Sequence, residues 1–142
     1  MPDYVTMTAL AAQLPGKFLI QALDDNQDGV ADAAVFAEIQ RAVREEIDAR
    51  LGQRYDMAAF GQNLPSIVLL AGRVFATETL YQRRGVSDKQ NPAAKQATEL
   101  RKKLDAIGNG EQPLTPKAKP TNASGGVLVA EAKTVSASGR SS

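Results

Sequence analysis

The side chains with the clearest spacing for chemistry lie in an acidic run between residues 24 and 35. Asp24, Asn26 and Asp28 occupy alternate positions, a glycine follows them, and Asp32 stands at the ninth position. Calcium loops of the EF-hand type use oxygen ligands at positions 1, 3 and 5, a glycine at 6 and a bidentate Glu at 12. The twelfth position here is a valine. The sequence therefore leaves two interpretations open, a degenerate divalent-cation site formed by these four residues or a polar turn with an Asp helix cap.

A second cluster of acids, Glu45, Glu46 and Asp48, has the residue type needed for acid-base catalysis. Successive helix positions point in different directions, so Glu45 and Glu46 do not face each other and form an ordinary solvated face. The 142 residues include no Cys and no His, which excludes thiol nucleophiles, disulfides and histidine acid-base chemistry. No glycine-rich phosphate-binding loop is present. We therefore expect a protein that is not an enzyme and that needs no cofactor and no structural metal.

Four arginines are candidates for contact with nucleic acid. Arg50 and Arg54 share one helical face, and Arg83 and Arg84 end the following helix. They could form a modest basic edge, or they could serve only in i,i+4 ion pairs and as charges at helix C-termini. The net charge of +1 gives no long-range attraction to DNA. A channel-facing or DNA-facing role would therefore need many copies of the same edge.

The elements that must position these groups are helical. Asp32 is suited to cap a long helix from Ala33 to about Tyr55, and Pro65 to open another that runs to about Arg84 and is apolar over most of its circumference. Two short apolar segments precede them, and a last helix ends at Ile107. The sequence predicts an all-α bundle of four to five helices with a long extended C-terminal tail. The predicted core residues are Ile39, Val43, Ile47, Leu51, Tyr55, Leu70 and Val74.

Composition divides the chain near Gly108. Residues 1–107 hold every aromatic residue and carry a net charge of −1, whereas residues 108–142 carry +2 and are rich in Pro, Ser and Gly. We predict a helical domain over 1–107 and an extended, low-complexity C-terminal arm over 108–142, with a possible short strand at 126–132. An unstructured end with a few valines is the alternative. The residues of the arm expected to contact partners are Leu114, Val127, Leu128 and Val129.

No export signal begins the chain, and the longest strongly apolar run, residues 67–71, is far shorter than a membrane span. We therefore expect a protein made in the cytoplasm that has no contact with a membrane.

The order of several short motifs resembles a known family. Tyr4-Val5-Thr6 is followed by Leu23-Asp24-Asp25 and by a helix that contains Glu46-Ile47-Asp48-Ala49-Arg50-Leu51 and closes on Arg54-Tyr55. Leu64-Pro65 then opens an apolar helix that ends in Leu80-Tyr81-Gln82-Arg83-Arg84. This arrangement, over roughly residues 4–104, resembles the small head-tail adaptor (connector, or head-completion) proteins of tailed bacteriophages and prophages of the Mu-like type.

The resemblance implies a structural virion protein at the head-tail interface, assembled in the host cytoplasm. Such helical proteins form a ring, commonly of twelve copies, that docks under the portal protein and extends the DNA channel. The ring joins the portal to the next neck or tail connector or to a tail terminator, and packaged DNA passes through it without sequence-specific binding. The resemblance implies buried roles for Ile47, Leu51 and Tyr55 and basic positions at Arg54, Arg83 and Arg84. The arm after Gly108 is longer than the core of such a family, which leaves its contact open.

Two other classes of function stay open beside this one. One is a divalent-cation-binding helical module that uses the loop at residues 24–35, and the other is a small DNA-binding or regulatory helical protein.

Overall fold

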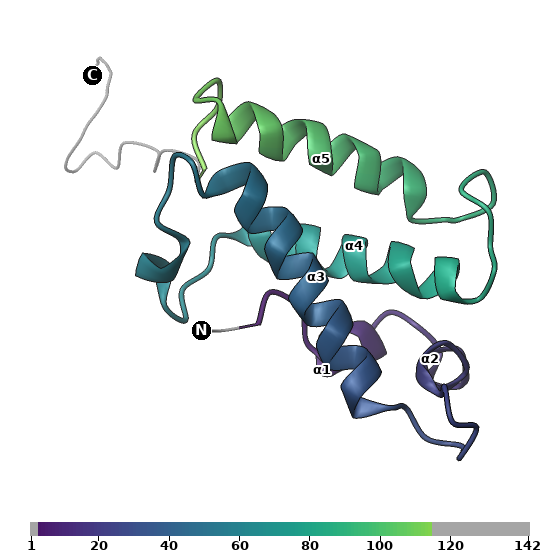
Figure 1. Cartoon of the computed structure of the whole chain (residues 1–142). Coiled ribbons are helices and arrows are strands. Elements are labelled where there is room, and N and C mark those ends of the chain that lie inside the picture. Colours follow the sequence, from purple (N-terminus) through teal and green to yellow (C-terminus); the bar gives the residue numbers. More distant parts are fainter. Residues whose placement is uncertain (1–2, 115–142) are drawn as a thin grey trace, which may run out of the picture.

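The computed structural model describes residues 3–114, and these form the all-α bundle that the sequence predicts (Figure 1). Within this part of the chain there are α-helices and one short 3-10 helix, and no strand. The strand predicted at 126–132 lies outside the described residues. The helices are α1 (Met7–Ala11), α2 (Gly16–Leu23), α3 (Ala33–Leu51), η1 (Met57–Phe60), α4 (Ser66–Arg83) and α5 (Ala94–Gly108).

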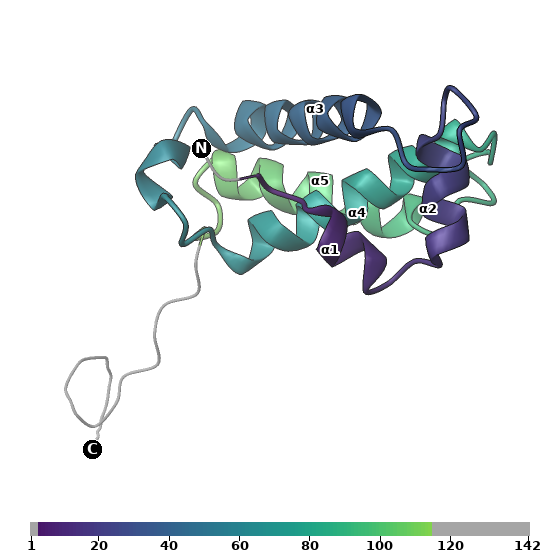
Figure 2. The same cartoon turned by 90° about the horizontal axis from the view of Figure 1, so that it is seen from below.

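Helix α4 is the central element, as its largely apolar surface predicts. It packs against α1, α2, α3 and α5, and it runs in the direction opposite to α3 and α5 (Figure 1). Helices α1 and α2 precede this three-helix unit and cover part of α4, which is visible when the molecule is seen from below (Figure 2). No helix within residues 3–114 combines the length and the apolar composition needed to cross a bilayer.

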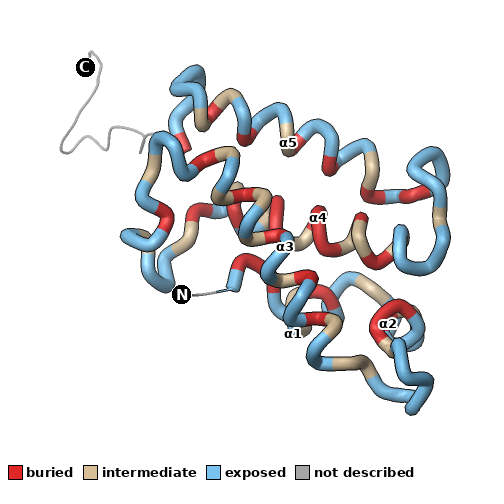
Figure 3. The backbone as a smooth tube through the Cα atoms, in the orientation of Figure 1, coloured by how far each residue is buried: buried red, intermediate tan, exposed pale blue. Residues whose placement is uncertain are grey.

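The core lies where these helices face one another (Figure 3). Helix α3 contributes an apolar stripe at steps of three and four residues, which is the spacing that keeps side chains on one face of a helix. Two of the seven residues predicted for the core, Tyr55 and Leu70, are half-buried at its edge. The other five are buried, namely Ile39, Val43, Ile47, Leu51 and Val74.

The helix ends follow the local sequence in most places. The Asp32 carboxylate accepts a hydrogen bond from the backbone N–H of Ala34 at 3.0 Å and so caps α3. Gly85, with φ of 78°, follows the last residues of α4, and the backbone N–H of Val86 then reaches the carbonyl of Tyr81 at 3.0 Å. A left-handed glycine with this bond is the usual way to satisfy the last carbonyls of a helix.

Helix α3 ends at Leu51, earlier than the predicted end near Tyr55. The residue after Leu51 is Gly52, and glycine has a low helix propensity. The chain continues in a bonded turn in which the N–H of Tyr55 donates to the carbonyl of Leu51 at 2.9 Å. Tyr55 therefore still packs against the core, although it lies outside the helix.

The N-terminal segment lies against α3 and α4 and is fixed by polar contacts. The buried Tyr4 donates its hydroxyl proton to Asp48 at 2.5 Å, and Gln40 donates to the carbonyl of Val5 at 2.9 Å. The segment approaches α4 so closely that a Cβ at Gly72 would lie 2.8 Å from the carbonyl carbon of Tyr4 and closer still to its oxygen. Only glycine fits this position without a shift of backbone.

Replacing Gly72 with Ala should lower the free energy of unfolding by about 1–3 kcal/mol, the usual cost of overpacking a filled site. The backbone of Tyr4 would have to move away from α4. Urea unfolding followed by circular dichroism measures the change. Gly16→Ala is the matched control, because nothing lies within 4 Å of a Cβ at that position. A Gly72→Ala variant as stable as this control would contradict the described packing.

The Tyr4 phenol should make stability depend on alkaline pH. Burial, the hydrogen bond to Asp48 and the charge of that carboxylate raise its pKa well above the ordinary value of about 10. The folded chain therefore keeps this proton at pH values where the unfolded chain loses it. The stabilisation is complete below about pH 10 and is lost as the pH rises further. Unfolding free energies measured from pH 8 to 11 should fall more steeply for the native chain than for Tyr4→Phe, and parallel curves would disprove this role.

Candidate functional site

The acidic loop after α2 is occupied by hydrogen bonds to its own backbone. The Asp24 carboxylate accepts from the N–H groups of Asp28 at 3.0 Å and Gly29 at 2.8 Å, and Asn26 accepts from Asp28 at 3.2 Å. Desolvation raises the pKa of Asp24, and the backbone hydrogen bonds lower it by more, so it lies below its ordinary value. The fourth ligand candidate, Asp32, caps α3. These oxygens stabilise a turn and the start of a helix.

Within residues 3–114, no three or more His, Cys, Asp or Glu side chains gather closely enough to hold a metal ion.

The loop after α2 also contacts α4. Arg83 at the end of α4 forms an ion pair with Asp25 and donates from Nε to the carbonyl of Ala22 at 2.8 Å. The loop therefore fastens α2 to α4.

The structure does not bring the four candidate arginines together on one edge. Arg50 and Arg54 lie near the C-terminal end of α3, whereas Arg83 and Arg84 lie at the C-terminal end of α4, at the other end of the bundle (Figure 1). Arg50 pairs with Asp105 at 2.7 Å and with Glu46 at 3.2 Å. Arg83 is engaged by the loop after α2. Within the described residues Arg54 and Arg84 are exposed and form no ion pair.

The strongest electrostatic feature joins α3, α4 and α5 through Arg101. Its guanidinium lies 2.6 Å from a carboxylate oxygen of Glu46 on α3 and 2.6 Å from one of Glu78 on α4. It also lies over the ring of Phe75, 4.7 Å from the centroid. The hydrogen bonds to Glu78 and Glu46 raise the pKa of Arg101. We call Glu46, Glu78 and Arg101 the three-helix ion cluster.

Sequence reasoning missed this cluster. Glu78 is 7% exposed, and the sequence signal for it is that it is the one carboxylate of the largely apolar helix α4. A charge on such a surface needs a partner, since an unpaired buried carboxylate is costly. The sequence does not show which of the many cations supplies it.

The carboxylates considered for acid-base chemistry are also engaged within the described chain. Glu45 pairs with Arg41 at 2.7 Å, and Glu46 belongs to the three-helix ion cluster. Asp48 accepts the hydrogen bond from Tyr4. Each of these groups therefore has a structural partner.

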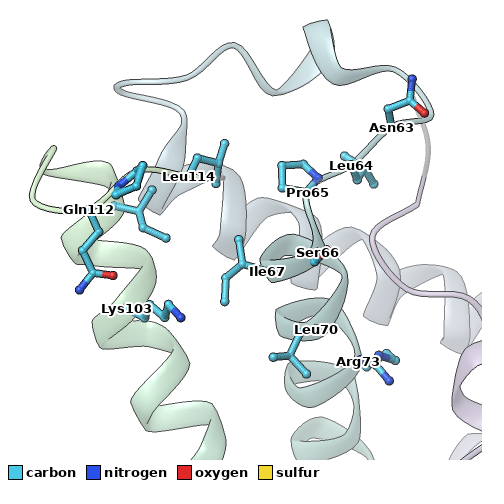
Figure 4. A pocket seen from close by; sticks show the side chains of 12 residues that line it. Asn63, Leu64, Pro65, Ser66, Ile67, Leu70, Arg73, Lys103, Gln112 and Leu114 are labelled. Atoms are coloured by element: carbon cyan, nitrogen blue, oxygen red, sulfur yellow. The ribbon is translucent and has the colours of Figure 1, made fainter. Parts of the chain in front are cut away.

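A candidate for binding is an apolar groove of about 970 Å³ (Figure 4), which we call the α4–α5 groove. Helix α4 contributes Ile67 and Leu70, and the end of α5 contributes Ile107. Arg73 and Lys103 are its only charged lining residues. The remaining lining residues are Asn63, Leu64, Pro65, Ser66, Gln112, Pro113 and Leu114.

The sequence predicts that Leu114 contacts partner molecules, but in the structure it packs against the core of its own chain. Its side chain is 6% exposed and belongs to the hydrophobic core, where it closes one end of the α4–α5 groove (Figure 4). The compact part of the molecule thus continues past the boundary expected at Ile107. The other three expected contact residues, Val127, Leu128 and Val129, lie outside the described residues.

These features define a small helical protein. Its charged groups hold the helices together, and the α4–α5 groove leaves apolar side chains open to a binding partner. A family model described as "Bacteriophage Mu, Gp36" matches residues 4–131. The chain therefore belongs to the bacteriophage Mu Gp36 family and is a phage protein. No curated protein and no solved structure matches it.

The family match extends the resemblance seen in the sequence. The helix motifs cover roughly residues 4–104 and leave the arm unaligned, whereas the match continues to residue 131. The low-complexity composition of the arm offers no motif by which the sequence alone could show this. The arm up to Glu131 therefore belongs to the length that the family describes.

Replacing Arg101 with Met should lower the free energy of unfolding by about 1–3 kcal/mol, less than the loss for a fully buried ion pair because Arg101 is partly exposed. The variant leaves Glu78 buried without its cation. Chemical denaturation measures the effect, and Lys102→Met, at an exposed neighbouring position, should change stability by less than about 0.5 kcal/mol. Equal losses in both variants would show that the three-helix ion cluster does not stabilise the bundle.

Proposed function

We propose that the chain is a ring-forming head-tail adaptor of a tailed bacteriophage. About twelve copies dock under the portal protein, extend the DNA channel and join it to the next neck or tail component. The observation that carries the proposal is the family match over residues 4–131, which identifies a phage protein over nearly its whole length. Assembly takes place in the host cytoplasm, and the finished ring belongs to the virion. On this proposal the chain is not an enzyme and has no cofactor.

The bracing of the bundle supports a structural role. The three-helix ion cluster ties α3, α4 and α5 together, the bond from Tyr4 to Asp48 holds the N-terminal segment, and Arg83 holds the loop after α2. Because these contacts join elements far apart in the sequence, the body resists local opening. A ring subunit that transmits force between head and tail benefits from such a body.

The exposed arginines suit a passive DNA channel. Arg54 and Arg84 are exposed and form no ion pair within the described residues, so one of these two ends of the bundle can present cations to the channel. A single copy with a net charge of +1 binds DNA weakly. A ring repeats the same cation in every subunit, and its contacts with phosphates carry no sequence information.

The purified full-length chain should form a closed ring, alone or when mixed with the portal protein. Native mass spectrometry should then detect a species of about twelve chains of 15.1 kDa each, and negative-stain micrographs should show rings. A chain that stays monomeric in both conditions would disprove ring assembly.

Removing the gene from the phage tests the position in the virion separately. We expect DNA-filled heads and free tails that do not join, and we expect the wild-type gene supplied in trans to restore complete particles. Antibody against the chain should label the head-tail junction of normal particles. Normal particle assembly without the chain would overturn the adaptor proposal.

A further inference from the structure

The α4–α5 groove has a chemical character that restricts what can occupy it. Its floor is formed by Ile67, Leu70 and Ile107, and its only charged lining residues are Arg73 and Lys103. Neither cation forms an ion pair within residues 3–114. The groove therefore fits an apolar segment that carries a carboxylate.

The described chain ends inside this groove. Leu114 lines it, and the next apolar run of the sequence begins at Val127, after a connection of twelve residues, 115–126. A random coil of twelve residues has an end-to-end distance of roughly 20 Å, which keeps the residues after it within reach of the groove. Tethering at this length corresponds to an effective concentration of about a millimolar. Such a concentration favours occupancy even by a segment of modest affinity.

Residues 127–131, which we call the docking segment, have the complementary chemistry. The sequence Val127-Leu128-Val129-Ala130-Glu131 combines an apolar run with the only acidic side chain that follows Leu114. In an extended chain alternate side chains share a face, and an extended docking segment would place Val127, Val129 and Glu131 together. That face carries two apolar groups and one carboxylate, as the groove requires.

The extent of the family match supplies an independent observation. The match ends at residue 131, the last residue of the docking segment. The connection and the segment are thus both inside the length that the family describes, and the more polar residues after them are outside it.

We propose that the docking segment of each chain folds back into the α4–α5 groove of the same chain. Val127 and Val129 cover the apolar floor, and Glu131 pairs with Lys103 on the α5 side of the groove (Figure 4). This inference goes beyond the adaptor proposal and does not require a ring. A partner that binds the same segment must first displace it from the groove, so the groove acts as a competitor for that partner.

Disulfide trapping tests the proposal in the full-length chain, which has no cysteine of its own. The variant Ser66→Cys with Ala130→Cys places one thiol at the exposed edge of the groove and one in the docking segment. The control, Ser66→Cys with Ser138→Cys, has its second thiol farther along the arm. For an undocked arm the two rates of disulfide formation should differ by only about twofold, from tether length alone. Docking should make the 66–130 disulfide form at least tenfold faster, within one chain and independently of protein concentration.

Further variants test the contacts. Val127→Asp with Val129→Asp, added to the 66–130 pair, should reduce its rate to that of the control. Lys103→Glu should slow the reaction at least threefold, whereas Lys102→Glu, an exposed neighbour that does not line the groove, should not change it. Equal effects of the two lysine variants would disprove the pairing with Glu131.

Two outcomes would overturn the inference as a whole. A rate ratio near two would show that the docking segment does not occupy the groove, which would then be open to a different protein. Disulfides formed only between a Ser66→Cys chain and an Ala130→Cys chain mixed with it would assign the groove to a second copy. Native mass spectrometry tests ring assembly separately. The presence or absence of a ring therefore does not change how the disulfide rates are interpreted.

Discussion

The bundle depends on one cation held between three helices. Arg101 on α5 meets Glu46 on α3 and Glu78 on α4, and its guanidinium also covers the ring of Phe75. The low exposure of Glu78 favours this arrangement, since leaving the buried carboxylate without its cation would cost about 1–3 kcal/mol. An apolar core can accept several packings, but a buried charge has few positions for its partner. The cluster thus fixes how the three long helices are aligned.

Other contacts extend this alignment to the rest of the body. A Cβ at Gly108 would meet the backbone of Arg50, which shows that α5 ends in close contact with α3, much as Tyr4 lies against Gly72 on α4. The residues whose order resembles the adaptor family include several that make such contacts, among them Tyr4, Glu46, Asp48 and Arg83. The motifs that suggested the family therefore have a structural use in this chain. They hold the described body in shape and leave the α4–α5 groove open.

This division between body and surface suits a protein whose proposed work is mechanical. Most charged side chains of the body that sequence reasoning offered for chemistry serve instead as caps, turn ligands and ion-pair partners. The open features are an apolar groove with a cationic rim and two exposed arginines at different ends of the bundle. The family match over the arm adds a segment whose chemistry is complementary to the groove.

Local and periodic information in the sequence was sufficient for the helices. The four-residue spacing of the α3 stripe, the Asp32 cap, the proline before α4 and the glycine after it depend on neighbours within a few turns, so they could be predicted with errors of a few residues at the ends. The family resemblance was likewise read from the order of short motifs. The structure alone decided which charges meet across helices, that Leu114 packs into the core, and that the four arginines divide between two ends of the bundle. Those outcomes depend on the crossing of helices distant in sequence, and no local propensity encodes which of several equivalent cations will lie opposite a buried carboxylate.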